Sequence, residues 1–501
     1  MKKYMKQFNV QPVVFLLSVG TIAALCAFTI IFRTTTANFF SNLQHEIVKN
    51  LGWFYILAMS GFLIFIIFLL FSKYGQIRLG SDDSRPKYSY FTWFAMLFSA
   101  GMGIGLLYYG VAEPILHYMS PPLGRPETMH AARTSMGVTF FHWGLHPWAC
   151  YSLVGLGLAY FSFRKKLPLS LRSLFHPILG ERIHGWAGHL IDTTAVVSTL
   201  FGVATSLGVG AMQVNAGLDR VFGFAVSPTN QMMLIIGITM LATISVVTGL
   251  DVGIRRLSEA NLCLAGLILL FTFFVGPTQF ILNSLVENIG HYLQTLPSNS
   301  FWTATLESDV QRKWLGDWTV FYWAWWIAWS PFVGLFIARV SEGRTLREFI
   351  MGVLFVPTTL GFIWFSVFGG SALHLEMLNS GVISGAVDKN VATAIFAMFD
   401  QFPLSSLLSM LTVICIMLFF VTSSDSASLV IDTIASGGAK NPHVSQRIFW
   451  AVTEGFVAAL LLVAGGLNAL QTATLTTALP FTIVLIIAAF SLLRALSKEK
   501  L

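Results

Sequence analysis

The stretch FYWAWWIAWSPF, from Phe321 to Phe332, sets four tryptophans and a tyrosine into one apolar run. A helix turns by about 100° per residue, so most of these rings fall within an arc of about 120°. The members of this arc are Tyr322, Trp325, Trp326, Trp329 and Phe332. Trp323 points away from them, toward lipid or a neighbouring helix. The rings therefore form one wall of the helix, and what this wall can bind depends on whether it lies within a membrane.

The composition of the whole chain answers that question. Of its 501 residues, 55% are hydrophobic and only 11% are charged, and the mean hydropathy is +0.72. Too little polar surface remains to cover a water-soluble globule of this length. The sequence therefore predicts an all-α integral membrane protein. Apolar stretches of about 20 residues predict twelve spans, near 13–32, 54–72, 91–111, 136–163, 190–218, 230–249, 258–282, 318–338, 349–370, 404–433, 446–465 and 473–493.

The distribution of charge predicts how these spans are oriented. Lys2, Lys3 and Lys6 precede an apolar run that is long and lacks the small-residue cleavage site of a signal peptide, so we expect this run to be retained. Threading twelve spans from a cytoplasmic N-terminus places most of the 30 Lys and Arg residues inside. Both termini should then be cytoplasmic. The net charge of +7 indicates topology and contact with anionic membrane lipids rather than nucleic-acid binding.

Three further clusters of unusual residues occur at the depth of the aromatic wall. In the fourth span, FHWGLHPWACYS carries Trp143, Trp148 and Tyr151, and Pro147 is expected to loosen the helix. The third span has glycine at 101, 103 and 105, where each costs about 1 kcal/mol relative to alanine. The tenth span has TSSDS at 422–426. Irregular backbone is tolerated at mid-membrane only where protein or a cavity surrounds it, so four clusters at one depth predict a binding site.

The chemistry of these clusters favours a particular ligand. An aromatic wall without a well-placed lysine or arginine suits a cation that cannot donate hydrogen bonds, such as a quaternary ammonium. Cation–π attraction is worth up to about 2 kcal/mol per desolvated ring, so three or four rings supply roughly 4–8 kcal/mol. A carboxylate on the same ligand could bind the free amides of the glycine-rich break. The hydroxyls of Thr422 and Ser423 suit a small coupling cation.

Coupling of some kind is expected because no GxxxxGK[ST] motif and no domain able to hydrolyse a nucleotide are present. Any uphill work must therefore use an ion gradient, and no cofactor is expected. Asp425 is expected to be a structural partner of backbone or hydroxyl groups beside the site, with a coupling proton as the alternative.

Other interpretations of single residues stay open. Trp318 and Tyr322 fit the interfacial aromatic belt of membrane proteins, and glycine or hydroxyl clusters also occur where helices pack closely. His142 and His146 have the i,i+4 spacing of two zinc ligands, but no HExxH motif and no third ligand accompany them, so packing histidines are expected. Glu113 is expected to cap or anchor a loop. A cation channel or a membrane metalloenzyme are the alternatives from other functional classes.

Four motifs closely resemble those of a known family, the betaine/carnitine/choline transporters. They are GMGIG at 101–105, FHWGL at 141–145, FYWAWWIAWSPFVG at 321–334 and TSSDSAS at 422–428. The resemblance extends from the second span to the last. It implies a secondary active transporter that imports an osmolyte, and a homotrimer in the bacterial inner membrane.

The resemblance also implies the architecture. One transmembrane domain over 1–501 would contain twelve helices, with LeuT-type inverted five-helix repeats preceded by two extra helices. The two leading helices would occupy 1–90, the repeats 91–283 and 318–494, and an interfacial connecting helix 284–317, of which 284–296 has the pattern of a helix lying on the membrane surface. Each repeat would open with a broken helix, at GMGIG in the first and at WSPF in the second.

The family's functional residues carry over by motif. The box for the ammonium group would consist of Trp143, Trp148, Tyr151 and Trp326. The pathway would be lined by Trp325, Trp329 and Phe332. The carboxylate would meet the backbone at Ala100, Gly101, Met102 and Gly103. One sodium site would use the carbonyls of Ser99, Met102 and Phe419 and the hydroxyls of Thr422 and Ser423.

The chain departs from the family pattern at three positions. A second sodium site keeps Thr199, but Val203 replaces the threonine one turn later and offers no side-chain oxygen, so proton coupling stays open as the alternative. Gly105 stands where proton-driven choline carriers of the family usually have an aspartate, which favours a zwitterion such as glycine betaine over choline. Glu342 stands where a basic residue is common. The first hypothesis is sodium-coupled import of glycine betaine, and the second is proton-coupled uptake of choline or betaine.

Overall fold

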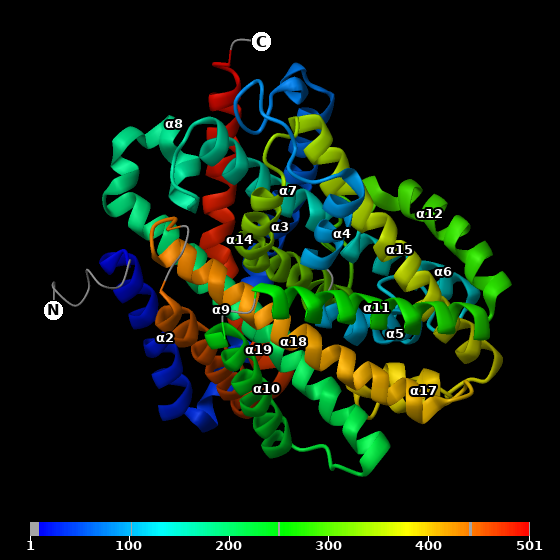
Figure 1. Cartoon of the computed structure of the whole chain (residues 1–501). Helices are drawn as coiled ribbons and strands as arrows, with labels where there is room; N and C mark the ends of the chain where they lie inside the picture. The colour runs from blue at the N-terminus through cyan, green and yellow to red at the C-terminus, as the bar shows by residue number, and fades with distance from the viewer. Residues whose placement is uncertain (1–9, 102, 249–250, 440–442, 500–501) are drawn as a thin grey trace.

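The computed structural model describes residues 10–101, 103–248, 251–439 and 443–499, with the backbone alone at 33–37, 98–101, 248 and 251–256. Helices dominate this part of the chain, as the sequence predicted (Figure 1). Nine of the helical stretches described are long and apolar enough to cross a membrane. They lie in α2 (Pro12–Ile31), α3 (Arg33–Phe71), α9 (Trp186–Phe222), α10 (Pro228–Thr248), α11 (Asp251–Val275), α13 and α14 (Asp309–Leu315 and Phe321–Val340), α15 (Leu346–Leu378), α18 (Ser405–Ala435) and α19 (Val444–Leu496).

The third predicted span is divided into two helices, as its glycines predicted. The first, α4 (Tyr90–Gly101), ends within the GMGIG motif, and α5 (Ile104–Met119) begins just after it. Gly103 has extended backbone angles, with φ −156° and ψ −158°, so the helix is interrupted at this residue. Met102 lies outside the described residues.

The fourth predicted span is also divided, but the break lies at Gly144 rather than at Pro147. It separates α6 (Met129–Trp143) from α7 (Leu145–Ala159). A Cβ atom on Gly144 would lie 2.5 Å from the Phe140 carbonyl oxygen and 2.8 Å from the Tyr292 hydroxyl. That hydroxyl accepts a hydrogen bond from the Leu145 N–H at 3.1 Å. Pro147 then lies in the first turn of α7, where its missing N–H is tolerated.

The expected break at WSPF is wrong. The helix α14 continues through Pro331 to Val340. Proline cannot donate to the carbonyl of the residue four positions earlier, which here is Ile327. The Ser330 hydroxyl donates to the Ile327 carbonyl at 2.8 Å instead, so this carbonyl keeps a partner and the helix is preserved.

The last two predicted spans form one long element, α19, which contains non-helical backbone at Gly465 and Gly466. This glycine pair falls at the end of the predicted span 446–465, so a connection between the two spans was expected close to this point. The count of twelve spans stays a prediction.

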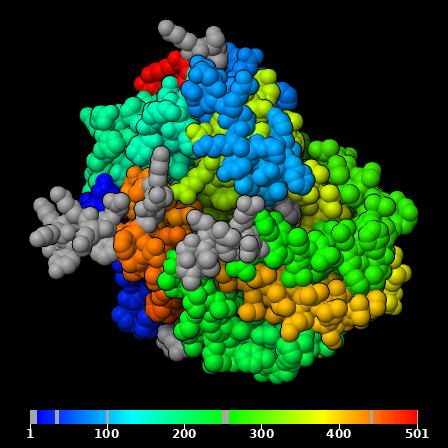
Figure 2. All heavy atoms as spheres, viewed as in Figure 1, coloured from blue at the N-terminus to red at the C-terminus, as the bar shows by residue number. Residues whose placement is uncertain are grey.

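Two elements form the centre of the molecule. In the apolar windows of α9 and of α13–α14, 94% of the residues are buried, against 22% in α11 and 28% in α2. The element α9 packs on α18 and α19, and α14 packs on α7 (Figure 1). Glycines in α9 allow these close contacts, since a Cβ on Gly208 would lie 2.4 Å from the Leu470 side chain. The less buried α10 and part of α18 lie on the molecular surface, where Figure 2 shows them in green and orange.

The connector after α11 contains the helix that its pattern predicted. This helix, α12 (Thr278–Ser300), covers the whole of 284–296 and packs on α6 and α15. Its position relative to a membrane surface stays a prediction. Shorter helices complete the connectors, namely α8 (His176–Leu179), α16 (Ser384–Val387) and α17 (Ala394–Phe399).

The two ends of the described chain are tied to one set of loops. The Gln11 N–H, before α2, donates to the Ala435 carbonyl at the end of α18. Beyond α19, the Glu499 carboxylate accepts from Arg164 at 3.0 Å, lies 2.6 Å from the Lys165 ammonium and accepts from the Tyr160 hydroxyl. Burial opposes ionisation of Glu499, but these hydrogen bonds outweigh it and lower its pKa to about 2.

Candidate functional site

The four rings predicted to form the ammonium box lie inside the protein and touch one another in a chain. Trp143 of α6 meets Trp326 of α14 edge to face, with ring centroids 4.8 Å apart. Trp326 lies 6.4 Å from Tyr151 of α7, and Tyr151 lies 5.4 Å from Trp148 one turn away. All four side chains are at most 8% exposed. Three helices thus bring the four predicted residues together, and none of the rings faces lipid.

Hydrogen bonds of the indole N–H groups fix how the rings of α14 are turned. Trp326 donates to the His142 carbonyl at 2.9 Å. Trp325 and Trp329 both donate to the Gly202 carbonyl of α9, at 3.3 and 2.9 Å. Buried indoles normally use their N–H in this way. With its N–H engaged at one edge, each ring keeps its π face for other contacts.

The predicted pathway residues adjoin the box. Trp325 stacks on Trp326, with centroids 5.1 Å apart and planes 9° from parallel. Trp329 meets Phe332 edge to face at 5.4 Å. Trp323, which faces the other side of α14, stacks on His146 at 5.0 Å. It therefore meets a neighbouring helix, and the alternative that it faces lipid is wrong.

Two glycines of GMGIG lie against this group of rings. A Cβ on Gly105 would lie 2.9 Å from Cη2 of Trp143 and 3.2 Å from Cη2 of Trp325, so glycine is needed for the indoles to approach α5. A Cβ on Gly103 would lie 3.9 Å from Trp329. The rest of the predicted carboxylate site is not described in side-chain detail: Ala100 and Gly101, like Ser99, are described by their backbone alone, and Met102 lies outside the described residues.

Several predicted ion ligands lie near the same break. The Ser423 hydroxyl of α18 lies 4.0 Å from the Cβ position of Gly103. The Thr422 hydroxyl is 3.3 Å from the Phe419 carbonyl and donates to the Leu418 carbonyl at 2.9 Å. These oxygens of α18 are therefore adjacent to one another and to the interrupted helix.

At the second predicted sodium position, only one of the two side-chain oxygens of the family pattern is present, the hydroxyl of Thr199. The Thr199 hydroxyl is fully buried and has no hydrogen-bond partner among the described residues. Val203, one turn later on α9, is buried and apolar.

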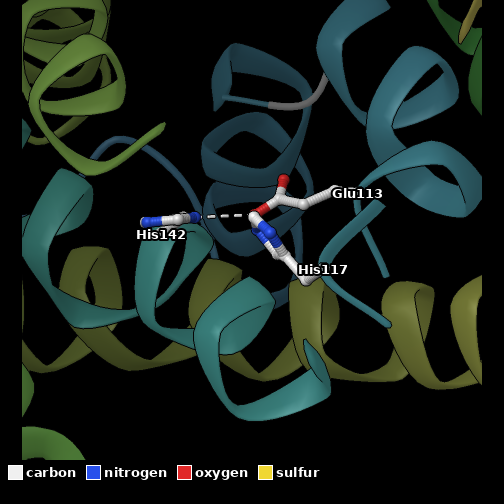
Figure 3. Close-up of side chains that lie close together, drawn as sticks. All are labelled: Glu113, His117 and His142. Atoms are coloured by element: carbon white, nitrogen blue, oxygen red, sulfur yellow. Dashed lines mark hydrogen bonds and ion pairs between the residues drawn. The ribbon is translucent and has the colours of Figure 1, made fainter. Parts of the chain in front are cut away.

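A buried carboxylate, Glu113, contacts the aromatic box through Trp143 and lies beside His117 and His142 (Figure 3). One oxygen accepts from the Trp143 indole at 2.8 Å and from the Tyr322 hydroxyl. The other lies 2.7 Å from Nδ1 of His142 and 3.4 Å from Nε2 of His117.

The prediction that Glu113 anchors a loop is therefore wrong, because the residue lies inside α5 with its side chain fully buried. The belt interpretation of Tyr322 is wrong for the same reason, since its side chain is fully buried and reaches Glu113.

His142 and His146 are hydrogen-bonded to separate partners, as expected of packing histidines, and do not pair as two zinc ligands. His146 approaches the Ser300 hydroxyl of α12 at 3.2 Å, whereas His142 turns toward Glu113 and, through Nε2, toward the Thr319 hydroxyl at 2.9 Å.

Donor atoms of Glu113, His117 and His142 all lie within 4.8 Å of one another, which is close enough to hold a metal ion. The sequence did not point to this trio, because His142 comes from a different helix; the i,i+4 spacing of Glu113 and His117 was its only local sign.

A second buried carboxyl group lies beside the hydroxyl cluster of α18. Glu454 of α19 accepts from the Ser424 hydroxyl at 3.1 Å, and its other oxygen has no hydrogen-bond partner among the described residues. Asp425 pairs with Arg447 at 2.9 Å. The partner described for Asp425 is therefore a guanidinium group rather than the expected backbone or hydroxyl groups, and its structural role stays a prediction.

Comparison with known proteins is consistent with this geometry. The family model described as betaine/carnitine/choline family transporter matches residues 13–501. The glycine betaine transporter OpuD of Bacillus subtilis is 46% identical over 488 residues, which cover 97% of this chain and 94% of the relative. The glycine betaine transporter of Acinetobacter baylyi is 44% identical over 490 residues, 97% of this chain and 74% of the relative. An uncharacterized transporter of Mycobacterium tuberculosis is 47% identical over 496 residues, 97% of this chain and 83% of the relative.

The family model spans nearly the whole chain, and these relatives are named as transporters. The chain therefore belongs to the betaine/carnitine/choline transporter family, and it is a membrane transporter and not an enzyme.

Proposed function

We propose that this protein imports glycine betaine by sodium-coupled alternating access. The observation that carries the proposal is the ring-to-ring chain of Trp143, Trp326, Tyr151 and Trp148, which is buried and supplied by three helices. Aromatic faces attract a methylated ammonium group without having to satisfy any hydrogen-bond donor on it. Relatives over the full chain are named as glycine betaine transporters.

The proposed architecture is twelve spans in LeuT-type inverted repeats. Nine stretches meet the length and hydropathy of a span. The divided pairs α4–α5 and α6–α7 would each add one, because two half-helices joined by a buried break can cross a membrane together. Dividing α19 at Gly465 and Gly466 would give the twelfth. The leading helices would lie within 1–90, the repeats within 91–283 and 318–494, and the connecting helix within 284–317.

Glycine betaine, a zwitterion, is proposed over choline because the aromatic box lies beside the interrupted helix, where the GMGIG motif has glycine at 103 and 105. Gly103 interrupts the helix, and free backbone amides at such a break are suited to a carboxylate. Gly105 leaves no side-chain carboxylate at the position where one would compete with that of the ligand. One relative, a glycine betaine/proline/choline transporter of Vibrio parahaemolyticus, is 45% identical over 503 residues, so choline is the natural competitor to test.

Sodium is proposed as the coupling ion because hard oxygen ligands gather beside the break. The Thr422 and Ser423 hydroxyls and the Phe419 carbonyl would complete a site with the backbone of Ser99 and Met102. Thr199 would contribute to a second, weaker position, since Val203 supplies no oxygen.

Proton coupling is the second candidate, and Glu454 favours it. A fully buried carboxyl group with one hydroxyl donor and one oxygen without a partner among the described residues suits a group that exchanges a proton during transport. The Ser424 hydroxyl, which donates to it, follows directly after Thr422 and Ser423 in the sequence.

We further propose a bacterial inner-membrane protein with both termini in the cytoplasm, assembled as a homotrimer. The orientation is supported by the loops that tie both chain ends together. The Gln11 N–H bonds to Ala435 at the end of α18, and a Cβ on nearby Gly438 would lie 2.8 Å from the Leu169 amide nitrogen. This loop continues from Arg164, which binds Glu499 at the other end of the chain. Both ends therefore lie beside one basic loop, as the positive-inside rule favours for a cytoplasmic face.

The test is uptake of labelled glycine betaine into proteoliposomes, with sodium and proton gradients imposed separately and with choline as competitor. Sodium-driven, saturable uptake with counterflow is expected, and uptake driven by the proton gradient alone would favour the second candidate. A flux without counterflow would indicate a channel and refute the proposal.

Trp326→Leu should abolish uptake, because it removes the ring that joins the two halves of the box. Trp323→Leu is its matched control, since Trp323 lies on the same helix and is equally buried but faces His146. Equal loss of uptake in both variants, at equal thermal stability, would mean that the site is misplaced.

A further inference from the structure

Glu113 has no role in the functional assignment made so far, yet it is the most fully engaged side chain near the box. Its carboxylate lies within hydrogen-bond reach of four groups from three elements. Two are the histidines that Figure 3 draws beside it, His117 of α5 and His142 of α6. The other two are Trp143 of α6 and Tyr322 of α14. One of these, Trp143, is itself a box residue. An isolated loop anchor would not need this set of partners at zero exposure.

The hydrogen-bond pattern assigns a negative charge to this group. Trp143 can only donate, and the Tyr322 hydroxyl shares the same oxygen with it, so that oxygen acts as an acceptor. Ionised carboxylates are acceptor-only groups and can take all four contacts, whereas a protonated carboxyl would have to place its own hydrogen among them. The described contacts therefore fit a carboxylate.

The two histidines do not cancel that charge. In a charged histidine both ring nitrogens carry a hydrogen. Nδ1 of His117 is buried with no hydrogen-bond partner among the described residues, and a buried N–H left without an acceptor is costly. His117 is therefore neutral, with Nε2 donating to Glu113. His142 can donate to Glu113 from Nδ1 and accept from the Thr319 hydroxyl at Nε2, so the neutral tautomer satisfies both of its atoms.

No lysine or arginine balances the charge in the described part of the chain, where the ion-pair partners of Glu113 are these two histidines. The cluster as a whole thus carries one negative charge, held at the N–H edge of a ring whose face belongs to the box. An indole that donates its N–H to an anion also has a more electron-rich face, which strengthens its attraction for a cation.

We propose that Glu113 is a positioning and charge-selecting residue of the transport site: through Trp143 and Tyr322 it orients the box, and its charge favours ligands that carry a permanent cation. This inference rests on the proposed function, since it names the feature of the ligand that the site senses. Without a positive charge of its own, a ligand of equal shape would be disfavoured.

The test compares two ligands that differ only in that charge. One is glycine betaine, and the other is 3,3-dimethylbutanoate, in which carbon replaces the ammonium nitrogen. Their affinities are measured as inhibition constants against labelled glycine betaine in proteoliposomes containing the full chain. Since both carry the same carboxylate, the ratio of the two constants reports the attraction for the ammonium charge alone. A buried unit charge one indole away is expected to contribute on the order of tenfold to this ratio.

Glu113→Gln should therefore lower the preference for glycine betaine over its carbon analogue by about tenfold. Glu113→Asp, which keeps the charge on a shorter side chain, should retain most of the preference even where both affinities fall. The Gln variant decides between a charge effect and a purely structural role, and a lost preference in Asp, which keeps the charge, would overturn the proposal. A purely structural role would weaken both ligands equally and leave the ratio unchanged in both variants, and this result would also overturn it.

The two levels of inference fail in different ways. If the wild-type protein shows no preference for glycine betaine over the carbon analogue, the proposed function fails. If the wild type shows the preference and Glu113→Gln keeps it in full, only the role of Glu113 fails.

Discussion

The sharpest prediction concerns Gly105, which lies against two indoles. In Gly105→Ala, the added Cβ would lie 2.9 Å from Trp143 and 3.2 Å from Trp325. Carbon atoms in ordinary contact are about 3.5 Å or more apart, so the Trp143 ring must retreat by at least about 0.6 Å. Its N–H is held by Glu113 at 2.8 Å, so the retreat either stretches this hydrogen bond or tilts the ring.

The cost of such overpacking is typically about 1–3 kcal/mol. If most of it falls on the geometry of the box, the KM for glycine betaine should rise by about tenfold, because about 1.4 kcal/mol corresponds to a factor of ten. The measurement is the sodium-driven uptake rate as a function of glycine betaine concentration, together with the thermal unfolding temperature in detergent.

Gly157→Ala is the matched control. Its Cβ would lie 2.9 Å from the Leu174 side chain, a similar clash at a position outside the box. This variant should lose stability to a similar or smaller extent, because leucine is more flexible than an indole, and should keep the wild-type KM. An unchanged KM in Gly105→Ala, or an equal rise in both variants, would refute the reasoning.

Three further predictions follow from other contacts. Ser330→Ala leaves the Ile327 carbonyl without its hydroxyl donor and should cost about 1 kcal/mol of stability, measured as a lower unfolding temperature; an unchanged temperature would contradict this. The pKa of Glu499 is lowered, so its ion pairs stabilise the protein fully above about pH 4.5 and progressively less as the pH falls toward about 2. The unfolding temperature of Glu499→Gln should accordingly fall below that of the wild type at pH 6 and approach it near pH 3; a constant difference would argue against the ion pairs. Val203→Thr adds an oxygen one turn from the Thr199 hydroxyl and should steepen the dependence of uptake on sodium, and an unaltered dependence would mean that this position binds no ion.

Periodicity predicted which rings of residues 321–332 share one face of a helix, whereas the family resemblance supplied the members of the aromatic box. Trp143, Trp148, Tyr151 and Trp326 come together as the motifs indicated. The breaks were harder to place. A sequence shows that Pro331 lacks an N–H, but not that a neighbouring hydroxyl replaces it.

The role of Glu113 could not be predicted for a different reason. Its four partners come from α5, α6 and α14, and nothing in a single sequence specifies which faces of separate helices meet. The same limit applies to Gly144, whose neighbour Tyr292 lies on α12. What the sequence supplied were the residues that are unusual for their depth, and the structure supplied their pairing across helices.

The Gly202 carbonyl accepts hydrogen bonds from the indole N–H groups of both Trp325 and Trp329, and it thereby links α9 to α14. Because the acceptor belongs to the main chain, no substitution at position 202 can delete it. A bulkier side chain there would instead wedge the two elements apart, since its Cβ would lie 3.0 Å from Ala328. The number of these hydrogen bonds can therefore be changed only by substituting the indoles of α14, one at a time. Any movement of α14 away from α9 must break two hydrogen bonds to a single oxygen.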